Sequence, residues 1–186
     1  MAELFEVFKS RAEAVSAEVH RFAGKTAARE FILDFLRAEN IADVHQSRAV
    51  WVNGALLDGV DRGRLAEEVP GLAFEVTREA AEGSKIGITE LELAVADTGT
   101  LVTDATPVER RLASALPAIH VAIVPTAGLA PDMAGALARI HPDRCGYISM
   151  ITGPSRTADI ERVLTIGVHG PARLIIVFVD ELESRR

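Results

Sequence analysis

The sequence predicts an α/β fold, with a mostly parallel sheet that carries helices on both faces. From residue 120 onward, apolar runs of strand length alternate with helical segments, in the order HVAIVP, APDMAGALARI, GYISMITG, TADIERVL and ARLIIVFV. Runs rich in β-branched residues and separated in this way are typical of parallel strands joined by right-handed crossovers. Amphipathic helices at the start of the chain are the second indication of this fold.

The first 40 residues are expected to form an N-terminal helical segment. Leu4, Val7, Phe8 and Val15 recur at helical spacing, and a second apolar stripe runs over 28–36 and stops near residue 40. This segment is either a cover packed on its own sheet or a docking element for a partner. The rest of the chain shows no linker, so residues 1–186 are expected to form a single domain.

The middle of the chain contains shorter strand candidates. AVWVNG at 49–54 and LAFEVT at 72–77 are of β type. Within 86–105, alternating Leu91, Leu93 and Val95 favour a strand, whereas Thr89 followed by glutamates also fits the start of a helix, so both interpretations stay open. Asp97 to Thr100 is predicted to be a turn.

Composition excludes several classes of protein. The 186 residues carry a formal net charge of -7, which argues against nucleic acid as a partner. Cys145 is the single cysteine, so this chain is expected to hold no iron-sulfur cluster. The acidic start does not resemble a signal peptide, and no apolar run approaches the ~20 residues that cross a bilayer. We therefore expect a cytoplasmic protein without membrane insertion.

A candidate anion site follows the strand at 148–152. Ser155, Arg156 and Thr157 stand where a helix is expected to begin, so its free N–H groups could bind a small carboxylate or phosphate. Helix capping by Ser155 or Thr157 explains the same residues equally well. In a parallel sheet the turn holding His169 would lie at the opposite edge, which favours a structural role for that histidine.

A second set of candidate ligand-binding residues lies in the predicted turn. Thr98, Gly99 and Thr100 offer two hydroxyls and a flexible backbone, although a tight turn alone accounts for them. The sequence has no GxSxG, GxxxxGK[ST] or GxGxxG motif and no Cys/His spacing typical of a metal site. No catalytic residue is assigned.

Several sequence blocks taken together carry a resemblance to a known family. GIT at 87–89, AVADTGTLV at 94–102, RRLASALPAIHVAIV at 110–124 and ITGPSRTADIERVLTIGVHGP at 151–171 resemble the LUD domain family, and within it the C-type lactate utilization proteins. The resemblance covers about residues 87–179. Where the family often has an aspartate after GIT, this chain has Glu90, Leu91 and Glu92, so any role of that aspartate would fall to Glu92.

The resemblance implies a fold similar to the group of ribose-5-phosphate isomerase, glucosamine-phosphate deaminase and CoA-transferase. It also implies a part in oxidation of L-lactate to pyruvate beside iron-sulfur partner subunits, with this chain as the subunit that carries no redox centre. The alternatives are a free-standing enzyme acting on a phosphorylated or carboxylated small molecule, and a ligand-sensing or scaffold protein. Whether the chain is itself an enzyme stays open.

Overall fold

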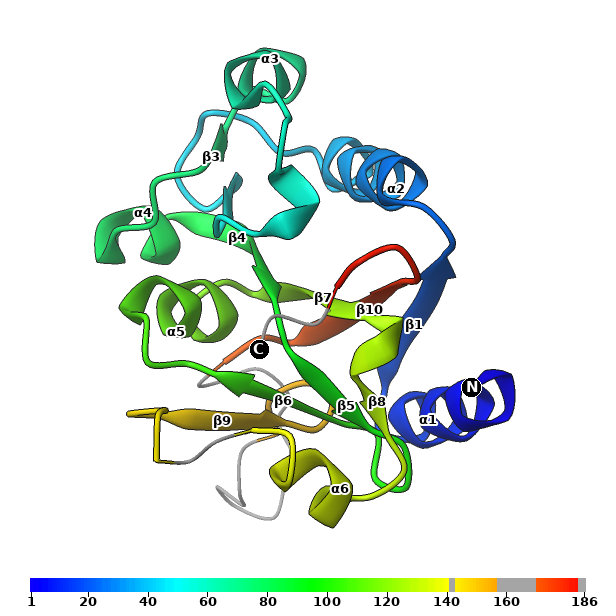
Figure 1. The fold of residues 1–186 in the computed structure, drawn as a ribbon. Helices are drawn as coiled ribbons and strands as arrows, with labels where there is room; N and C mark the ends of the chain where they lie inside the picture. Colours follow the sequence, from blue (N-terminus) through cyan, green and yellow to red (C-terminus); the bar gives the residue numbers. More distant parts are fainter. Residues whose placement is uncertain (141–142, 157–169, 184–186) are drawn as a thin grey trace.

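The fold is built on a six-stranded sheet whose neighbouring strands are all parallel (Figure 1). A computed structural model describes residues 1–140, 143–156 and 170–183. The sheet confirms the predicted α/β class. Its strands, in spatial order, are β1 (Ala17–Phe22), β10 (Arg173–Val179), β7 (Ile119–Pro125), β4 (Ser84–Glu90), β2 (Arg48–Trp51) and β3 (Leu72–Ala73).

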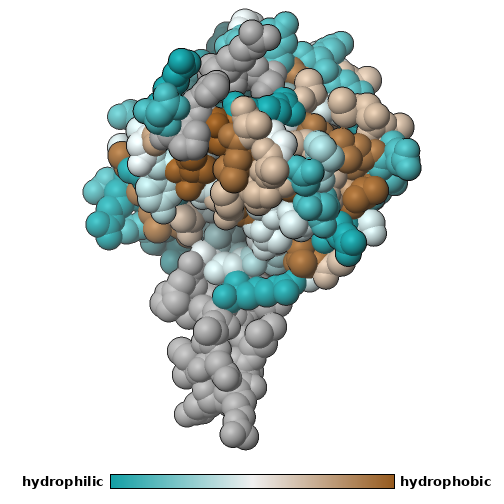
Figure 2. All heavy atoms as spheres, turned by 60° about the horizontal axis from the view of Figure 1, so that its bottom comes forward, coloured by the Kyte–Doolittle hydropathy of each residue, from teal (hydrophilic) through white to brown (hydrophobic). Residues whose placement is uncertain are grey.

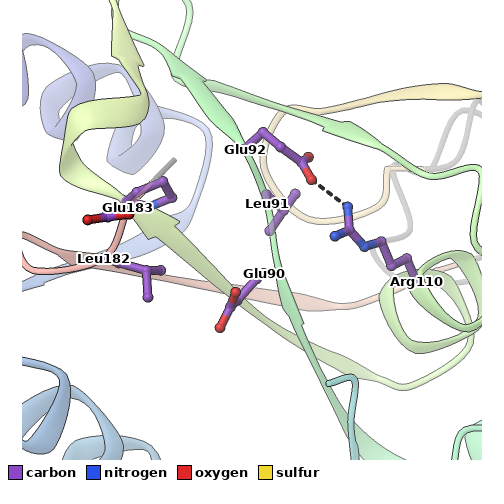
Figure 3. A pocket seen from close by; sticks show the side chains of 7 residues that line it. Glu90, Leu91, Glu92, Arg110, Leu182 and Glu183 are labelled. Atoms are coloured by element: carbon purple, nitrogen blue, oxygen red, sulfur yellow. Dashed lines mark hydrogen bonds and ion pairs between the residues drawn. The ribbon is translucent and has the colours of Figure 1, made fainter. Parts of the chain in front are cut away.

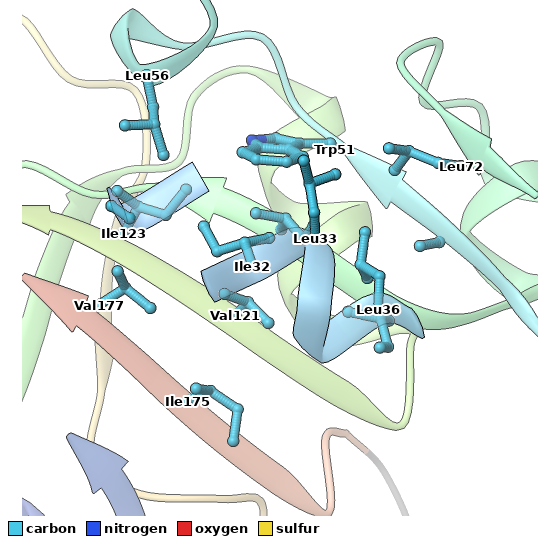
Figure 4. Close-up of a cluster of buried hydrophobic side chains, with 14 of the residues drawn as sticks. Ile32, Leu33, Leu36, Trp51, Leu56, Leu72, Val121, Ile123, Ile175 and Val177 are labelled. Carbon is cyan, nitrogen blue, oxygen red and sulfur yellow. The ribbon is translucent and has the colours of Figure 1, made fainter. Parts of the chain in front are cut away.

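One face of this sheet, here called the α2 face, is covered by α2 (Lys25–Ala38), α3 (Arg62–Glu68) and the short helix η1 (Ala55–Leu57). Alternate strand residues such as Trp51, Val121 and Ile175 pack there against Ile32 and Leu36 of α2 (Figure 4). Because side chains alternate along a strand, the residues between them must point to the opposite face.

That opposite face, here called the α1 face, is covered by α1 (Ala2–Ala14), α4 (Arg78–Glu82) and α5 (Val108–Ala115). Phe5 and Phe8 of α1 meet Phe178 of β10 edge to face, with ring centroids 5.4 and 5.1 Å apart. Helices on both faces confirm the predicted layering.

A second, four-stranded sheet lies over the α1 face (Figure 1). The apolar residues between the sheets include Ala94, Leu101 and Leu174. The outer side of this small sheet is covered by α6 (Met133–Leu137). Its strands, in spatial order, are β8 (Leu129–Ala130), β5 (Leu93–Val95), β6 (Thr100–Asp104) and β9 (Ile148–Ile151).

The small sheet corrects one expectation and answers the open question over 86–105. The GYISMITG strand is β9, but it pairs antiparallel with β6 instead of joining the parallel sheet. Residues 86–105 form the end of β4, then β5, a turn at 96–99 and β6, with no helix. The local pattern specifies a strand, whereas the choice of sheet depends on contacts distant in sequence.

The N-terminal 40 residues contain a strand that the helical pattern does not indicate. Strand β1 follows α1 after Ser16, which has a φ of 71°, and pairs with β10 at the edge of the main sheet. LAFEVT contributes only Leu72–Ala73 as strand. The predicted helix TADIERVL falls in 157–169, outside the described residues. Within the described part of the chain, no helix has the length and apolar character needed to cross a membrane.

Candidate functional site

A cavity of about 290 Å³ lies between the α1 face of the main sheet, strand β9 and the end of α5. Three parts of the chain that are far apart in sequence build its wall. The described lining residues are Ser114 and Ala115, His120, the segment 149–155, Gly170, Pro171 and Leu174. The predicted site residue Ser155 is therefore part of a cavity.

His120 and Thr89 form a buried hydrogen-bonded pair at this cavity. The Oγ1 of Thr89 lies 2.8 Å from Nε2 of His120, and the two residues are 2% and 1% exposed. In the register of β4 and β7, His120 stands opposite Gly87, and Thr89 is the next residue of β4 on the same face. The imidazole thus reaches Thr89 diagonally across the two strands.

Packing requires a glycine at position 87. A Cβ at Gly87 would overlap the carbonyl oxygen of Ala113, because α5 packs directly on β4 there. Ser114 follows Ala113 on α5 and lines the cavity. The GIT block therefore serves the site twice, by seating α5 and by supplying the Thr89 hydroxyl.

The loop of residues 152–156 is held in place by both neighbouring elements. The Ser155 N–H donates to the carbonyl of Pro171 at 2.8 Å, and Arg156 Nη2 donates to the carbonyl of Val15 at 3.0 Å. Gly153 has a φ of 68° and packs against Val15, so a side chain there would be strained and would clash. The end of α1 thus supports this side of the cavity.

The expectation that the Ser155 loop and the turn before the last strand lie at opposite edges is wrong. Ser155 contacts both Gly170 and Pro171, which immediately precede β10. The reason is that β9 belongs to the small sheet, so its carboxyl end is free to meet the amino end of β10. Thr157 and His169 themselves lie outside the described residues, and Ser155 and Arg156 are not helical.

The structure separates the three turn candidates. Thr100 lies at the site, since its Oγ1 is 2.8 Å from that of Thr152, which lines the cavity. Gly99 has a φ of 68° and packs tightly against the backbone of Ala12 in α1, so packing explains this glycine. Thr98 is exposed. Of this set, only Thr100 is joined to the cavity by a hydrogen bond.

The cavity wall is polar but uncharged over its described lining residues. Hydroxyl groups come from Ser114, Ser149, Thr152 and Ser155, and the rest of the wall is largely apolar. Burial lowers the pKa of His120 to about 4, so the imidazole is neutral at physiological pH. A neutral imidazole offers one hydrogen-bond donor and one acceptor. Such a wall can bind and orient a small hydroxylated ligand.

Sequence reasoning missed His120, Thr89 and Ser114. The sequence does indicate His120, because HVAIVP is otherwise a continuous apolar run and a polar residue in such a run is expected to be buried. Nothing local marks Thr89 or Ser114, whose relevance comes from the packing of β4 against β7 and α5.

The glutamates after the GIT block lie in a different place, at the carboxyl edge of the main sheet (Figure 3). The Glu90 carboxylate accepts hydrogen bonds from the N–H groups of Ala55 and Leu56, at 2.8 and 2.6 Å. The Glu92 carboxylate accepts a hydrogen bond from Arg110 at 2.5 Å and another from the N–H of Asp104 at 3.0 Å. These two bonds tie the β5–β6 hairpin to α5.

The space at these glutamates measures about 10 Å³, roughly the room for one water molecule. Both carboxylates already have hydrogen-bond partners within the chain. We therefore assign Glu90 and Glu92 to holding the fold rather than to ligand binding.

The described residues do not fit an iron-sulfur cluster or another metal centre. They contain no group of three or more His, Cys, Asp or Glu side chains arranged to hold a metal ion. Cys145 packs at the edge of the cluster under α6, and burial together with the nearby Asp104 carboxylate raises the pKa of its thiol. A protonated lone thiol is a poor metal ligand.

Comparison with known proteins identifies the family. The LUD domain matches over residues 5–179, almost the whole chain and including the N-terminal part. The chain belongs to the LUD domain family. Lactate utilization protein C of Exiguobacterium sp. is 40% identical over 114 residues, which are 58% of this chain and 50% of that protein. Lactate utilization protein C of Bacillus licheniformis is 36% identical over 127 residues, 65% of this chain and 53% of that protein.

A solved structure supports the fold. A DUF162 family protein from Deinococcus radiodurans aligns with a TM-score of 0.57 and 16% identity, over 96% of this chain and 97% of that one. At this identity the likeness concerns the fold alone. The chain spans about half the length of the curated relatives that it matches.

The sequence blocks that resemble the LUD family converge on the cavity. The GIT block supplies Thr89, the block at 94–102 supplies Thr100, and the block at 110–124 supplies Ser114 and His120. The segment 151–171 supplies both the Ser155 loop and Pro171. Blocks up to 84 positions apart in the sequence, from Gly87 to Pro171, thus meet at one cavity. This convergence makes the cavity the candidate functional site of the LUD fold in this chain.

Proposed function

We propose that this chain functions in lactate utilization, as the component without a redox centre in an iron-sulfur system that oxidises L-lactate to pyruvate. The names of its relatives support the process, since the matched proteins from Exiguobacterium sp. and B. licheniformis are both called lactate utilization protein C. The observation that carries the proposal is the convergence of the LUD blocks on one cavity of about 290 Å³, whose described lining residues include several hydroxyls and no charged side chain.

The division of labour follows from the chemistry of the reaction. Oxidation of a hydroxyl to a carbonyl releases two electrons, which a cofactor must accept, whereas an iron-sulfur cluster usually takes four cysteine ligands. With Cys145 as its single cysteine, this chain cannot supply them. The proposal therefore assigns electron transfer to cysteine-rich partner subunits.

Association needs a surface, and the small-sheet side of the molecule offers an apolar one. Figure 2 shows apolar side chains gathered in the middle of this side. Three large apolar residues on the elements of this side are exposed, namely Leu137 of α6 at 39%, Tyr147 just before β9 at 54% and Met150 of β9 at 49%. An apolar patch exposed on one side of a molecule is typical of protein contact surfaces, which supports the proposed association.

Affinity purification of the tagged chain from its own cells, grown on L-lactate, tests the proposed function. We expect cysteine-rich proteins with an iron-sulfur absorption band to co-purify. Leu137→Glu, on α6 and outside the cavity lining, should reduce their recovery, whereas Val108→Glu, at an exposed apolar residue on α5, should not. If no such protein is recovered, and the purified chain alone converts a phosphorylated or carboxylated compound, the free-standing enzyme is the better conclusion.

A further inference from the structure

We infer that the cavity beside His120 is a binding site for a small 2-hydroxy monocarboxylic acid, whose hydroxyl group hydrogen-bonds to the imidazole. The size and the hydroxyl of the ligand follow from the cavity itself. The choice of a monocarboxylic acid rests on the proposed function together with the lack of charged side chains among the described lining residues.

The size of the cavity limits the ligand. At about 290 Å³ it lies at the lower end of the ~300–1,000 Å³ typical of ligand pockets. Its described wall includes the segment 149–155, Pro171 and the apolar side chain of Leu174. This space suits a compact molecule with a short apolar part better than it suits a nucleotide.

The hydrogen-bonding groups favour a hydroxylated ligand. His120 lines the cavity while its Nε2 is paired with Thr89, and the imidazole is neutral. A neutral imidazole pairs well with a hydroxyl, which can donate as well as accept. Ser114, Thr152 and Ser155 add hydroxyls around it. The Thr89 bond fixes the ring orientation before a ligand arrives.

The described lining residues carry no charged side chain, and this favours a carboxylate over a phosphate as the anion. Burying a phosphate dianion without a cation is costly, whereas one carboxylate can be stabilised by a few hydroxyl and amide donors. Arg156, the nearest cation in the loop, is engaged with the carbonyl of Val15 outside the lining. The cavity is therefore suited to a monocarboxylate rather than to a phosphate ester.

A merely structural Thr89–His120 pair is the competing explanation, and calorimetric titration of the full chain distinguishes the two. L-Lactate should bind the wild-type protein. Propionate, which lacks the hydroxyl, and inorganic phosphate should bind at least tenfold more weakly. His120→Gln keeps a polar group near Thr89 but changes the geometry at the cavity, so it should weaken L-lactate binding at least tenfold. Thr98→Ala, at an exposed turn position beyond the lining, should leave binding unchanged.

A second variant keeps the test valid if His120→Gln does not fold. Ala115 is exposed at the end of α5 and lines the cavity, so Ala115→Leu should fill it without disturbing the core and abolish binding. Equal binding of propionate and L-lactate, tighter binding of phosphate, or unchanged binding by Ala115→Leu would overturn the inference. Co-purification of iron-sulfur partners without lactate binding would refute this inference alone, and binding without partners would refute the proposed function alone.

Discussion

Thr89 and His120 are 31 residues apart in sequence, yet their side chains meet at 2.8 Å on the buried α1 face of the main sheet. The residue of β4 opposite His120 is Gly87, and Thr89 is the next residue of β4 on the same face, so the imidazole reaches Thr89 diagonally across the two strands. A polar pair within an apolar core is costly unless it is satisfied. Here one polar residue from each of two neighbouring strands satisfies the other beside the cavity.

Thr89→Val should lower the free energy of unfolding by about 1–3 kcal/mol, because it leaves Nε2 of buried His120 without its Thr89 partner. Valine is close to threonine in shape, so the loss measures the hydrogen bond rather than a packing defect. Urea denaturation followed by circular dichroism gives the value. Thr98→Val, at an exposed position, should change it by no more than about 0.5 kcal/mol. Equal effects of the two variants would show that the pair contributes nothing.

The stability of the protein should fall as the pH drops from about 6.5 to 4, because of His120. Its pKa is lowered by burial from 6.5 to about 4 in the folded protein. Above pH 6.5 the His120 imidazole is neutral in the folded and in the unfolded protein. Between pH 6.5 and 4 the imidazole of the unfolded chain binds a proton that the imidazole of the folded chain does not. The unfolded state therefore gains up to about 3 kcal/mol. His120→Gln should remove this part of the pH dependence, and an unchanged slope in that variant would contradict the assignment.

Gly54→Ala should destabilise the protein clearly, although the backbone there is extended, with a φ of -159° that any residue adopts. The reason is space, since a Cβ at Gly54 would overlap the carboxylate of Glu90, which holds the N–H groups of Ala55 and Leu56. Gly63→Ala in helix α3, where a Cβ would meet Oδ1 of Asp61 at 3.3 Å and no other atom within 4 Å, is the control and should change the free energy of unfolding by no more than about 1 kcal/mol. Thermal denaturation compares the two, and equal melting temperatures would show that Glu90 moves aside freely.

Deletion of residues 1–40 should abolish folding. The deletion removes helix α1, helix α2 with its part of the main core, and strand β1, which pairs with β10 along six residues. This supports the interpretation of 1–40 as a cover over the docking interpretation. Phe8→Ala tests the same point more finely, because Phe8 is fully buried against Phe178, and the loss should be about 3–5 kcal/mol. Val7→Ala, at a neighbouring exposed position, should cost far less. A folded truncated chain would overturn this interpretation.

The sequence predicts the elements of this fold better than their arrangement. The runs at 120–125 and 173–179 are strands β7 and β10, because their continuous apolar character requires burial on both faces. Strand β1 escapes prediction because it lies at the sheet edge, is only six residues long and buries only Ala17 and Val19. The antiparallel pairing of β9 with β6 is not predicted, because no feature of the segment GYISMITG indicates to which sheet the strand belongs.

For the candidate site, local reasoning identifies the loop but not its surroundings. Ser155 stands out in the sequence, since glycine and proline precede it, and Thr100 stands out after a turn. Thr89, Ser114 and His120 become a site only through the packing of α5 and β7 on β4. The physical reason is that a cavity between two sheets is a property of packing, which no single segment contains.

The central claim is that the LUD blocks of this chain build a ligand site between the two sheets, and a crystal structure of the protein with L-lactate tests it most directly. We expect the ligand in the cavity beside His120, with its hydroxyl within hydrogen-bond distance of the imidazole and the Ser155 loop around it. An empty cavity at saturating L-lactate, or lactate bound instead at the carboxyl edge near Glu92 and Arg110, would contradict the claim.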